Sequence, residues 1–244
     1  MKKIEALKVK IFSDGVDKKD MLDMNSKNFI KGFTTNPSLM KKAGIKDYKS
    51  FAKDILATIK EKPISFEVFS DDLKDMEKEA RIIHSWGGNS YVKIPISNTK
   101  GNSTSDVISN LTKDGIKINV TAIFTVDQIT SILDFFNETT PSIVSVFAGR
   151  IADSGIDPMK IMNECSKILK SKKNIELLWA SSREVLNIFQ AEKTNSQIIT
   201  IAPEILDKIK FLNKDLNEFS LETVNDFFKD ANSAGFNILK KDPQ

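Results

Sequence analysis

Short runs of branched and aromatic residues alternate with longer segments of helical spacing along nearly the whole chain. Eight such runs read as buried strands, at residues 9–12, 29–34, 64–69, 91–95, 118–124, 143–147, 175–180 and 198–201. Helical spacing lies between them, for example at residues 48–60, 72–86, 106–113, 126–137, 158–171, 183–193 and 203–211. Strands that alternate with helices form parallel sheets. Eight units in a chain of 244 residues favour a closed (β/α)8 TIM barrel over an open doubly wound sheet.

The expected barrel takes residues 1–212, and a helical tail follows at residues 213–244. In this tail, Leu221, Val224, Phe227 and Phe228 recur at the spacing of an amphipathic helix. Such a helix can cover the base of its own barrel or dock on a neighbouring subunit. The spacing favours neither arrangement over the other.

The composition excludes several classes of function. A net charge of +3 is too small to indicate a nucleic-acid partner and mildly favours anionic metabolites. No run has membrane-spanning length, and the N-terminal segment lacks the apolar core of a secretory signal. We therefore expect a cytoplasmic protein without membrane or nucleic-acid partners. With one His and one Cys, zinc sites and Cys–His or Ser–His catalytic groups are nearly excluded, and Cys165 is expected to pack inside a helix. No GxGxxG turn follows a strand, which argues against a dinucleotide site.

Lys93 interrupts the apolar run YVKIP at residues 91–95. Lysine is almost never fully buried without a reason. An ammonium group that loses its water is more easily deprotonated, and the neutral amine can attack a carbonyl carbon to form a Schiff base. The alternative is a lysine on an edge strand whose ammonium reaches water. The other strand ends favour the first interpretation.

Polar side chains stand at the same end of seven successive expected strands. In a barrel, the carboxyl ends of the strands hold the reactive groups, and parallel strands are otherwise nearly all apolar. Residues two apart face the same side, so Asn119 shares a face with Thr121, and Ser145 with Phe147. Each residue alone could cap a turn, form an ion pair or merely favour a strand. Together they predict a site formed by Asp14, Thr34, Asn36, Glu67, Lys93, Asn119, Thr121, Ser145 and Phe147.

A phosphate site is expected beside this cluster. Ser181 and Ser182 precede a helical segment that is expected to begin at Arg183, and Arg150 follows the sixth run. Helix N-terminal amides and guanidinium groups bind anions, and phosphate sites in barrels are frequent near the last strands. The alternative is an N-cap with solvated arginines.

Five motifs resemble the transaldolase family, which includes short bacterial members and the fructose-6-phosphate aldolases. They are GFTTNPS at 32–38, YVKIP at 91–95, INVTAIF at 118–124, SVFAGRI at 145–151 and WASSRE at 179–184. The resemblance implies a class I aldolase-type enzyme that uses sugar-phosphate substrates, forms a homo-oligomer and needs no metal or other cofactor.

The resemblance also implies a role for each site residue. Lys93 would form the Schiff base, and Asp14 would act as acid and base on the hydroxyl at the bond that is cleaved. Glu67 and Thr121 would hold a water molecule that relays protons. The remaining residues would bind the dihydroxyacetone unit (Thr34, Asn36, Asn119, Ser145) and the phosphate (Arg150, Ser181, Arg183).

Three positions separate the activities within the family. Glu67, Ser145 and Phe147 match the transaldolases, whereas the fructose-6-phosphate aldolases have Gln, Ala and Tyr there. Ser182 departs from the pattern, because many members have Phe at this position. The resemblance thus favours a transaldolase of the pentose phosphate pathway. The alternatives are an aldolase that releases the ketone, including one for a specialised sugar phosphate, and a barrel that binds sugar phosphates without catalysis.

Overall fold

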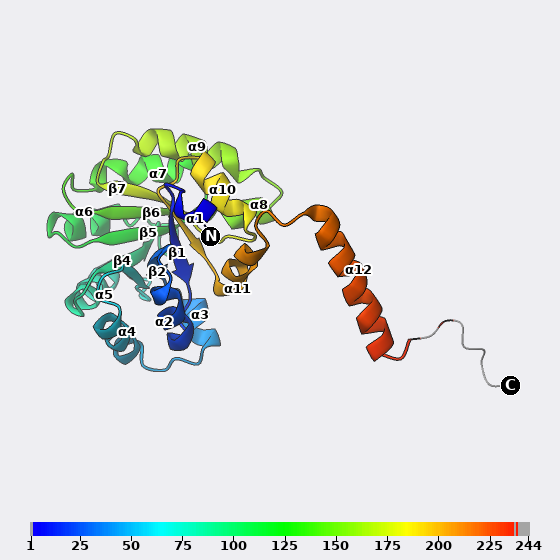
Figure 1. Cartoon of the computed structure of the whole chain (residues 1–244). Helices are drawn as coiled ribbons and strands as arrows, with labels where there is room; N and C mark the ends of the chain where they lie inside the picture. Colours follow the sequence, from blue (N-terminus) through cyan, green and yellow to red (C-terminus); the bar gives the residue numbers. More distant parts are fainter. Residues whose placement is uncertain (1, 237, 239–244) are drawn as a thin grey trace. The chain divides into compact units, whose positions relative to one another are not determined.

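Eight parallel strands close into a barrel in the computed structural model, which describes residues 2–236 and 238 (Figure 1). The strands follow one another in sequence order, and the last pairs in parallel with the first. They are β1 (Lys10–Asp14), β2 (Ile30–Thr34), β3 (Ile64–Glu67), β4 (Ser90–Pro95), β5 (Ile118–Ile123), β6 (Ser142–Val146), β7 (Ile175–Trp179) and β8 (Ile198–Ile201). The predicted (β/α)8 TIM barrel is confirmed.

Helices precede, separate and follow the strands along the chain, and those between the strands surround the sheet (Figure 1). They are α1 (Lys2–Glu5), α2 (Lys18–Ser26), α3 (Pro37–Lys42), α4 (Tyr48–Thr58), α5 (Leu73–Ser85), α6 (Ser105–Lys113), α7 (Val126–Ile132), η1 (Leu133–Phe135), α8 (Ala148–Asp153), α9 (Pro158–Leu169), α10 (Leu186–Lys193), α11 (Pro203–Leu206) and η2 (Asp207–Phe211). The sequence pattern did not single out α2, α3 or α8, because these helices are short and bury few apolar residues. Cys165 is fully buried in α9, and burial raises the pKa of its thiol to about 12.

Side-chain caps define where several of these helices begin. The carboxylates of Asp72 and Asp157 accept hydrogen bonds from the first amides of α5 and α9. Thr125 and Gln128 form a reciprocal capping box at the start of α7. Such caps stabilise a helix by about 1 kcal/mol each, because they satisfy amides that have no partner within the helix. The caps therefore hold the loops at the carboxyl ends of the strands in place.

Large apolar side chains fill the inside of the barrel beneath these loops. Phe12 of β1 packs with Ile143, Leu178 and Ile198 from the last three strands. The ring of Phe12 lies directly over Gly32 of β2, where an added Cβ would be 2.5 Å from a ring carbon. Only glycine therefore fits opposite Phe12. The packed core closes the barrel interior below the carboxyl ends, so that the barrel is not an open pore.

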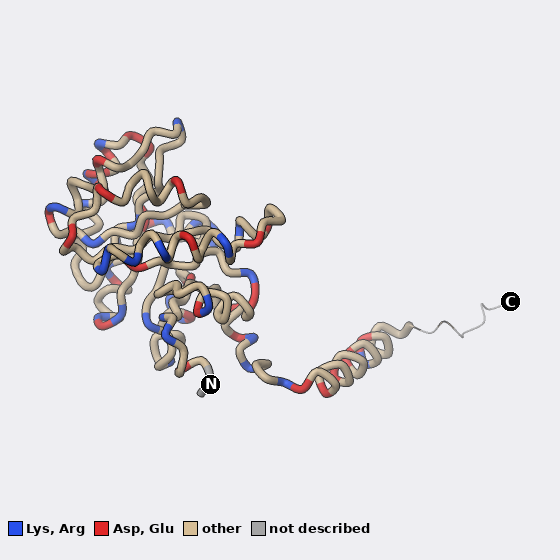
Figure 2. The backbone as a smooth tube through the Cα atoms, turned by 90° about the horizontal axis from the view of Figure 1, so that it is seen from above, with Lys and Arg blue, Asp and Glu red and all other residues tan. Residues whose placement is uncertain are grey.

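The chain divides into two compact units, Met1–Asp207 and Lys208–Gln244. The first unit contains the barrel. The second contains α12 (Leu216–Ser233), which begins before the apolar spacing at Leu221, because Asp215 caps the amides of Asn217 and Glu218. Figure 2 shows Lys and Arg intermixed with Asp and Glu along the backbone. Among residues 2–236 and 238, no helix has the length and apolar character needed to cross a bilayer.

Candidate active site

A cavity of about 510 Å³ opens at the carboxyl ends of the strands. Most of the residues predicted from the sequence line it, and they come from seven of the eight strands or from the loops that follow them. These residues are Asp14, Thr34, Asn36, Glu67, Lys93, Thr121, Ser145, Phe147, Arg150 and Ser181. Of the predicted set, Asn119 and Arg183 are not part of its lining.

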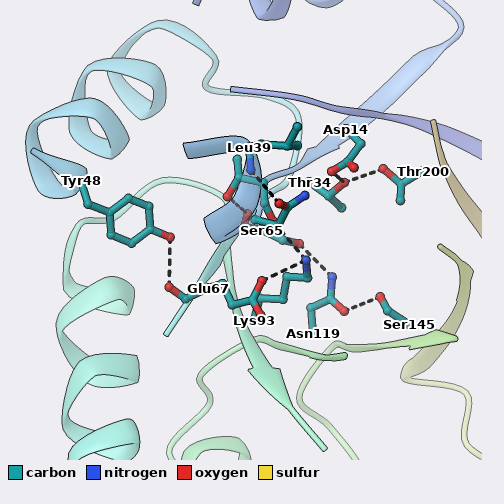
Figure 3. Close-up of polar contacts among 12 residues, drawn as sticks. Asp14, Thr34, Leu39, Tyr48, Ser65, Glu67, Lys93, Asn119, Ser145 and Thr200 are labelled. Atoms are coloured by element: carbon teal, nitrogen blue, oxygen red, sulfur yellow. Dashed lines mark hydrogen bonds and ion pairs between the residues drawn. The ribbon is translucent and has the colours of Figure 1, made fainter. Parts of the chain in front are cut away.

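The register of the strands places Lys93 beside a carboxylate. Glu67 of β3 is opposite Lys93 of β4, which is in turn opposite Asn119 of β5. The Nζ atom of Lys93 lies 3.2 Å from Oε2 of Glu67 and donates a hydrogen bond of 3.1 Å to the carbonyl oxygen of Thr35 (Figure 3). Lys93 is only 7% exposed. The amine is therefore buried, as the sequence predicted, and Glu67 lies where it can accept its proton.

Tyr48 holds the end of the strand that contains Glu67. Its hydroxyl donates a hydrogen bond of 3.1 Å to the backbone carbonyl of Glu67, and its ring packs edge-on against Phe66 and Trp86. Burial raises the pKa of Tyr48, so the hydroxyl remains a donor at neutral pH. This support from α4 was not predicted, because no pattern in the sequence links a helix residue to a strand carbonyl.

Asp14 is a partly buried ionisable group of the same cavity. Thr34 donates a hydrogen bond of 2.7 Å to Oδ1 of Asp14, and Thr200 of β8 lies 2.5 Å from the same Thr34 hydroxyl (Figure 3). Because Thr34 gives its proton to Asp14, Thr200 is the donor in this second bond. Burial raises the pKa of Asp14, although the charge of Lys93 and hydrogen bonds from Thr34 and Asn36 oppose the shift. A carboxyl group with a raised pKa is suited to both accept and return a proton.

Further hydroxyl and amide groups surround the amine. Asn119 donates to Ser65 (3.1 Å) and accepts from Ser145 (2.6 Å), so its side chain is fixed by both neighbours. Asn36 caps α3 by accepting a hydrogen bond from Leu39. The buried hydroxyl of Thr121 has no hydrogen-bond partner among the described residues and lines the cavity. It is therefore free to bind a ligand atom.

The loops after β6 and β7 touch at the other side of the cavity. Gly149 lies so close to Ser181 that an added Cβ would be 1.5 Å from the Ser181 carbonyl oxygen. Ser181 itself has a positive φ of 62°, a strained conformation for a residue with a side chain. The guanidinium of Arg150 lies over the ring of Phe147, 5.2 Å from its centroid. Arg150 and Ser181 thus place a cation and a hydroxyl at one wall.

The helix expected to begin at Arg183 begins three residues later. The side chain of Asn187 accepts hydrogen bonds from the amides of Arg183 (2.8 Å) and Glu184 (3.2 Å), so these residues form a capped turn before α10. Ser182 turns away and donates to the carbonyl of Thr200. The prediction that a helix begins at Arg183, directly after Ser181 and Ser182, was therefore wrong, and Asn187 already accepts the amide hydrogens of Arg183 and Glu184.

Several residues of the lining were missed by the sequence reasoning. Leu39, Lys42 and Thr200 all contact the cavity. The sequence held a signal for Lys42. Ser38 ends the motif at 32–38, and Lys42 follows it by four residues on α3, so the two side chains share one face of the helix and both line the cavity. Thr200 was the polar residue of the eighth strand, the one strand to which no site residue was assigned.

Comparison with known proteins assigns the chain to a family. A family model described as "Transaldolase/Fructose-6-phosphate aldolase" matches residues 11–240 of the chain. The chain belongs to the transaldolase/fructose-6-phosphate aldolase family. A "Probable transaldolase" of Dehalococcoides mccartyi is 34% identical over 199 residues, which are 81% of this chain and 88% of that protein. A "Probable transaldolase" of Thermoanaerobacter sp. is 32% identical over 231 residues, or 94% and 100% of the two chains.

The solved structures show the same architecture at much greater distance. The structure of a 2,3-dimethylmalate lyase has a TM-score of 0.51 and 9% identity, covering 100% of this chain and 89% of that one. This likeness shows the barrel fold alone. The match to the transaldolase/fructose-6-phosphate aldolase family, in contrast, includes every residue of the cavity, from Asp14 to Thr200. Because this is a family of transaldolase and aldolase enzymes, we take the cavity as the candidate active site.

Proposed function

We propose that the protein is a transaldolase that transfers a dihydroxyacetone unit between sugar phosphates through a Schiff base on Lys93. One observation supports the proposal above the others. The buried Lys93 amine lies 3.2 Å from the Glu67 carboxylate, in a cavity that also contains Asp14 and Thr121. Schiff-base cleavage of a ketose needs a nucleophilic amine, a proton acceptor and a separate acid–base group.

The first step forms the covalent bond. Glu67 accepts a proton from the Lys93 ammonium, and the amine attacks the carbonyl carbon of the ketose. The carbonyl oxygen takes up two protons and leaves as water while the carbon–nitrogen double bond forms. Glu67 and the unpaired hydroxyl of Thr121 can both bind the water that carries these protons. The resulting iminium withdraws electrons from the neighbouring carbon–carbon bond.

The second step breaks that bond. Asp14 takes the proton of the hydroxyl group, the electron pair of the carbon–carbon bond moves to the iminium, and an aldose phosphate leaves. The three-carbon enamine stays on Lys93 until a second aldehyde accepts it. Asp14, whose pKa is raised, can return the proton to the new alcohol. Ser145 lines the cavity, and we assign it to a hydroxyl of the bound unit, together with Asn119, which lies behind the lining and accepts the hydrogen bond of Ser145.

Trapping with borohydride tests this proposal. Reduction in the presence of fructose 6-phosphate should attach a three-carbon or six-carbon adduct to the protein, and peptide mapping should find it on Lys93. A requirement for erythrose 4-phosphate during turnover would separate a transaldolase from an aldolase that releases dihydroxyacetone. If no adduct forms under conditions in which substrate is bound, the covalent mechanism is wrong and the barrel only binds its ligand.

Transfer rather than release is expected because Phe147 offers no proton at the cavity wall. Its ring contacts Phe124 and the Arg150 guanidinium. We expect Phe147→Tyr to increase release of free dihydroxyacetone relative to transfer, since a phenol can donate a hydrogen bond to the water that hydrolyses the enamine. The measurement is the ratio of acceptor-dependent to acceptor-independent cleavage of fructose 6-phosphate.

Phe124→Tyr, one ring further from the cavity, is the control and should keep the original ratio. An equal ratio in all three proteins would mean that Phe147 is only packing.

The phosphate site predicts a separate effect on substrate binding. We expect Arg183→Ala to raise KM for fructose 6-phosphate roughly ten-fold and to change kcat by less than about three-fold, because a charged hydrogen bond to the phosphate stabilises ground state and transition state alike. Steady-state kinetics with fructose 6-phosphate measures both constants. An unchanged KM would exclude Arg183 from phosphate binding.

A further inference from the structure

The carboxylate of Asp153 lies at the predicted phosphate site and already binds one of its arginines. Nε of Arg183 is 3.1 Å from each carboxylate oxygen of Asp153, and Nη2 is 2.5 Å from Oδ2. The hydrogen bonds from Arg183, together with the charges of Arg183 and Arg150, lower the pKa of Asp153. Asp153 is therefore an anion throughout the neutral pH range. Both side chains are about half exposed, so a ligand can reach them from solvent.

The fold brings the two arginines and the carboxylate together through two loops. Arg150 and Asp153 are three residues apart on α8 and share one side of that short helix. The close contact between Gly149 and Ser181 docks α8 onto the loop after β7, and the Arg183 side chain passes 3.4 Å from the Cβ position of Gly149. Asp153 thus pairs with one of the two guanidinium groups that a phosphate would bind, and it lies within the electrostatic influence of the other.

The cavity lining shows that Arg183, which is paired with Asp153, does not reach the cavity. Arg150 and Ser181 line the cavity, whereas Arg183 does not. One edge of a guanidinium, formed by Nε and Nη2, binds a single oxyanion in a paired geometry. In Arg183 that edge is occupied by Asp153. A phosphate can bind the same edge only after the carboxylate has left it.

We propose that Asp153 is a built-in competitor that holds Arg183 away from the cavity until a substrate phosphate displaces it. The inference rests on the proposed phosphate site of Arg150, Ser181 and Arg183. The displaced group has one negative charge, whereas a phosphate ester has up to two and also gains Arg150. A substrate without phosphate has no anionic group that could displace Asp153 from Arg183. Asp153 therefore lowers the affinity for anions in general and leaves doubly charged phosphate esters as the ligands that bind well.

Calorimetric titration with inorganic phosphate tests the inference on the full-length protein. We expect Asp153→Asn to tighten phosphate binding roughly three- to five-fold, the size of an exposed charge pair. Arg183→Ala should weaken phosphate binding. The double variant Arg183→Ala/Asp153→Asn should bind phosphate less than about 1.5-fold more tightly than Arg183→Ala alone, because Asp153 then has no Arg183 side chain to pair with. If Asp153→Asn weakens phosphate binding or leaves it unchanged, Asp153 is a support for Arg183 and the inference is wrong.

A matched control is available elsewhere on the barrel. Asp114 pairs with Arg81 at 2.7 Å, and the two side chains are 55% and 41% exposed, against 53% and 47% for Asp153 and Arg183. Asp114→Asn removes the same charge from a similar pair and should leave the phosphate Kd unchanged. An equal tightening in this variant would attribute the effect to net charge and overturn the inference.

Kinetics and a Lys93 variant separate this inference from the proposed function. Asp153→Asn should lower KM for fructose 6-phosphate about as much as it lowers the phosphate Kd, with kcat and the kcat/KM of unphosphorylated fructose unchanged. A general structural change would alter both substrates. Lys93→Ala should bind phosphate like the original protein, so the competitor can be tested even if no Schiff base forms.

Discussion

Lys93→Arg is expected to lose at least about 10⁴-fold in kcat while the barrel remains folded. Arginine keeps the positive charge next to Glu67, but its guanidinium stays protonated and forms no Schiff base. The whole covalent route is lost, so the loss should be far larger than that of a misplaced binding group. Lys93→Ala should be as inactive and less stable, because it leaves Glu67 without its partner at the end of β3.

The test combines activity, borohydride trapping and thermal unfolding. Lys117→Arg is the matched control, since Lys117 precedes β5 at the opposite end of the barrel and donates a hydrogen bond of 2.6 Å to Asn89. This variant should keep normal activity and should still be labelled on Lys93. More than about a tenth of the original activity in Lys93→Arg would rule out the covalent mechanism.

Asp14→Asn is expected to lower kcat by roughly 10³-fold and at the same time to stabilise the fold. An amide cannot accept the hydroxyl proton, which explains the loss of activity. The gain in stability follows from burial, which raises the pKa of Asp14 in the folded protein. A buried carboxylate loses its water without full compensation, and a neutral amide of the same shape avoids this cost.

The direction of the pH dependence follows from the raised pKa. Below the unfolded pKa, Asp14 is protonated in both states and its ionisation does not affect stability. As the pH rises from the unfolded pKa towards the folded pKa, the unfolded chain loses the proton that the folded one keeps, and the original protein loses stability. Asp14→Asn has no such group. The stability difference between the two proteins should therefore grow as the pH rises above about 4, the ordinary pKa of an aspartate, and level off once the raised folded pKa is passed.

Thermal unfolding across this pH range measures the effect. For a chain of this size, each kcal/mol of difference in the free energy of unfolding should shift Tm by about 2–4 °C. Asp134→Asn, a substitution at an exposed position, is the control and should show no comparable increase with pH. If Asp14→Asn is less stable than the original protein at high pH, the hydrogen bond from Thr34 and the charge of Lys93 outweigh burial.

The sequence was sufficient to predict the barrel and most of the cavity. The alternation of strands and helices determines the order of the parallel strands, and the carboxyl ends of such strands all meet at one end of the barrel. A lysine in an apolar strand therefore had to lie near the polar residues that end the other strands. Lys93, Asp14 and Thr121 line one cavity for this reason. The resemblance to known motifs added the expected chemical roles, which position alone does not supply.

Only the tertiary structure decided which of these side chains contact one another. The pair formed by Thr34 and Thr200 joins residues 166 positions apart, and it exists because β8 closes onto β1. The contact between Arg183 and Asp153 depends on two loops that touch at Gly149. Strand order and periodicity specify the end of the barrel at which a residue lies. Loop conformation and barrel closure decide which hydrogen bonds form there, because these bonds depend on shifts of an ångström that no local pattern encodes.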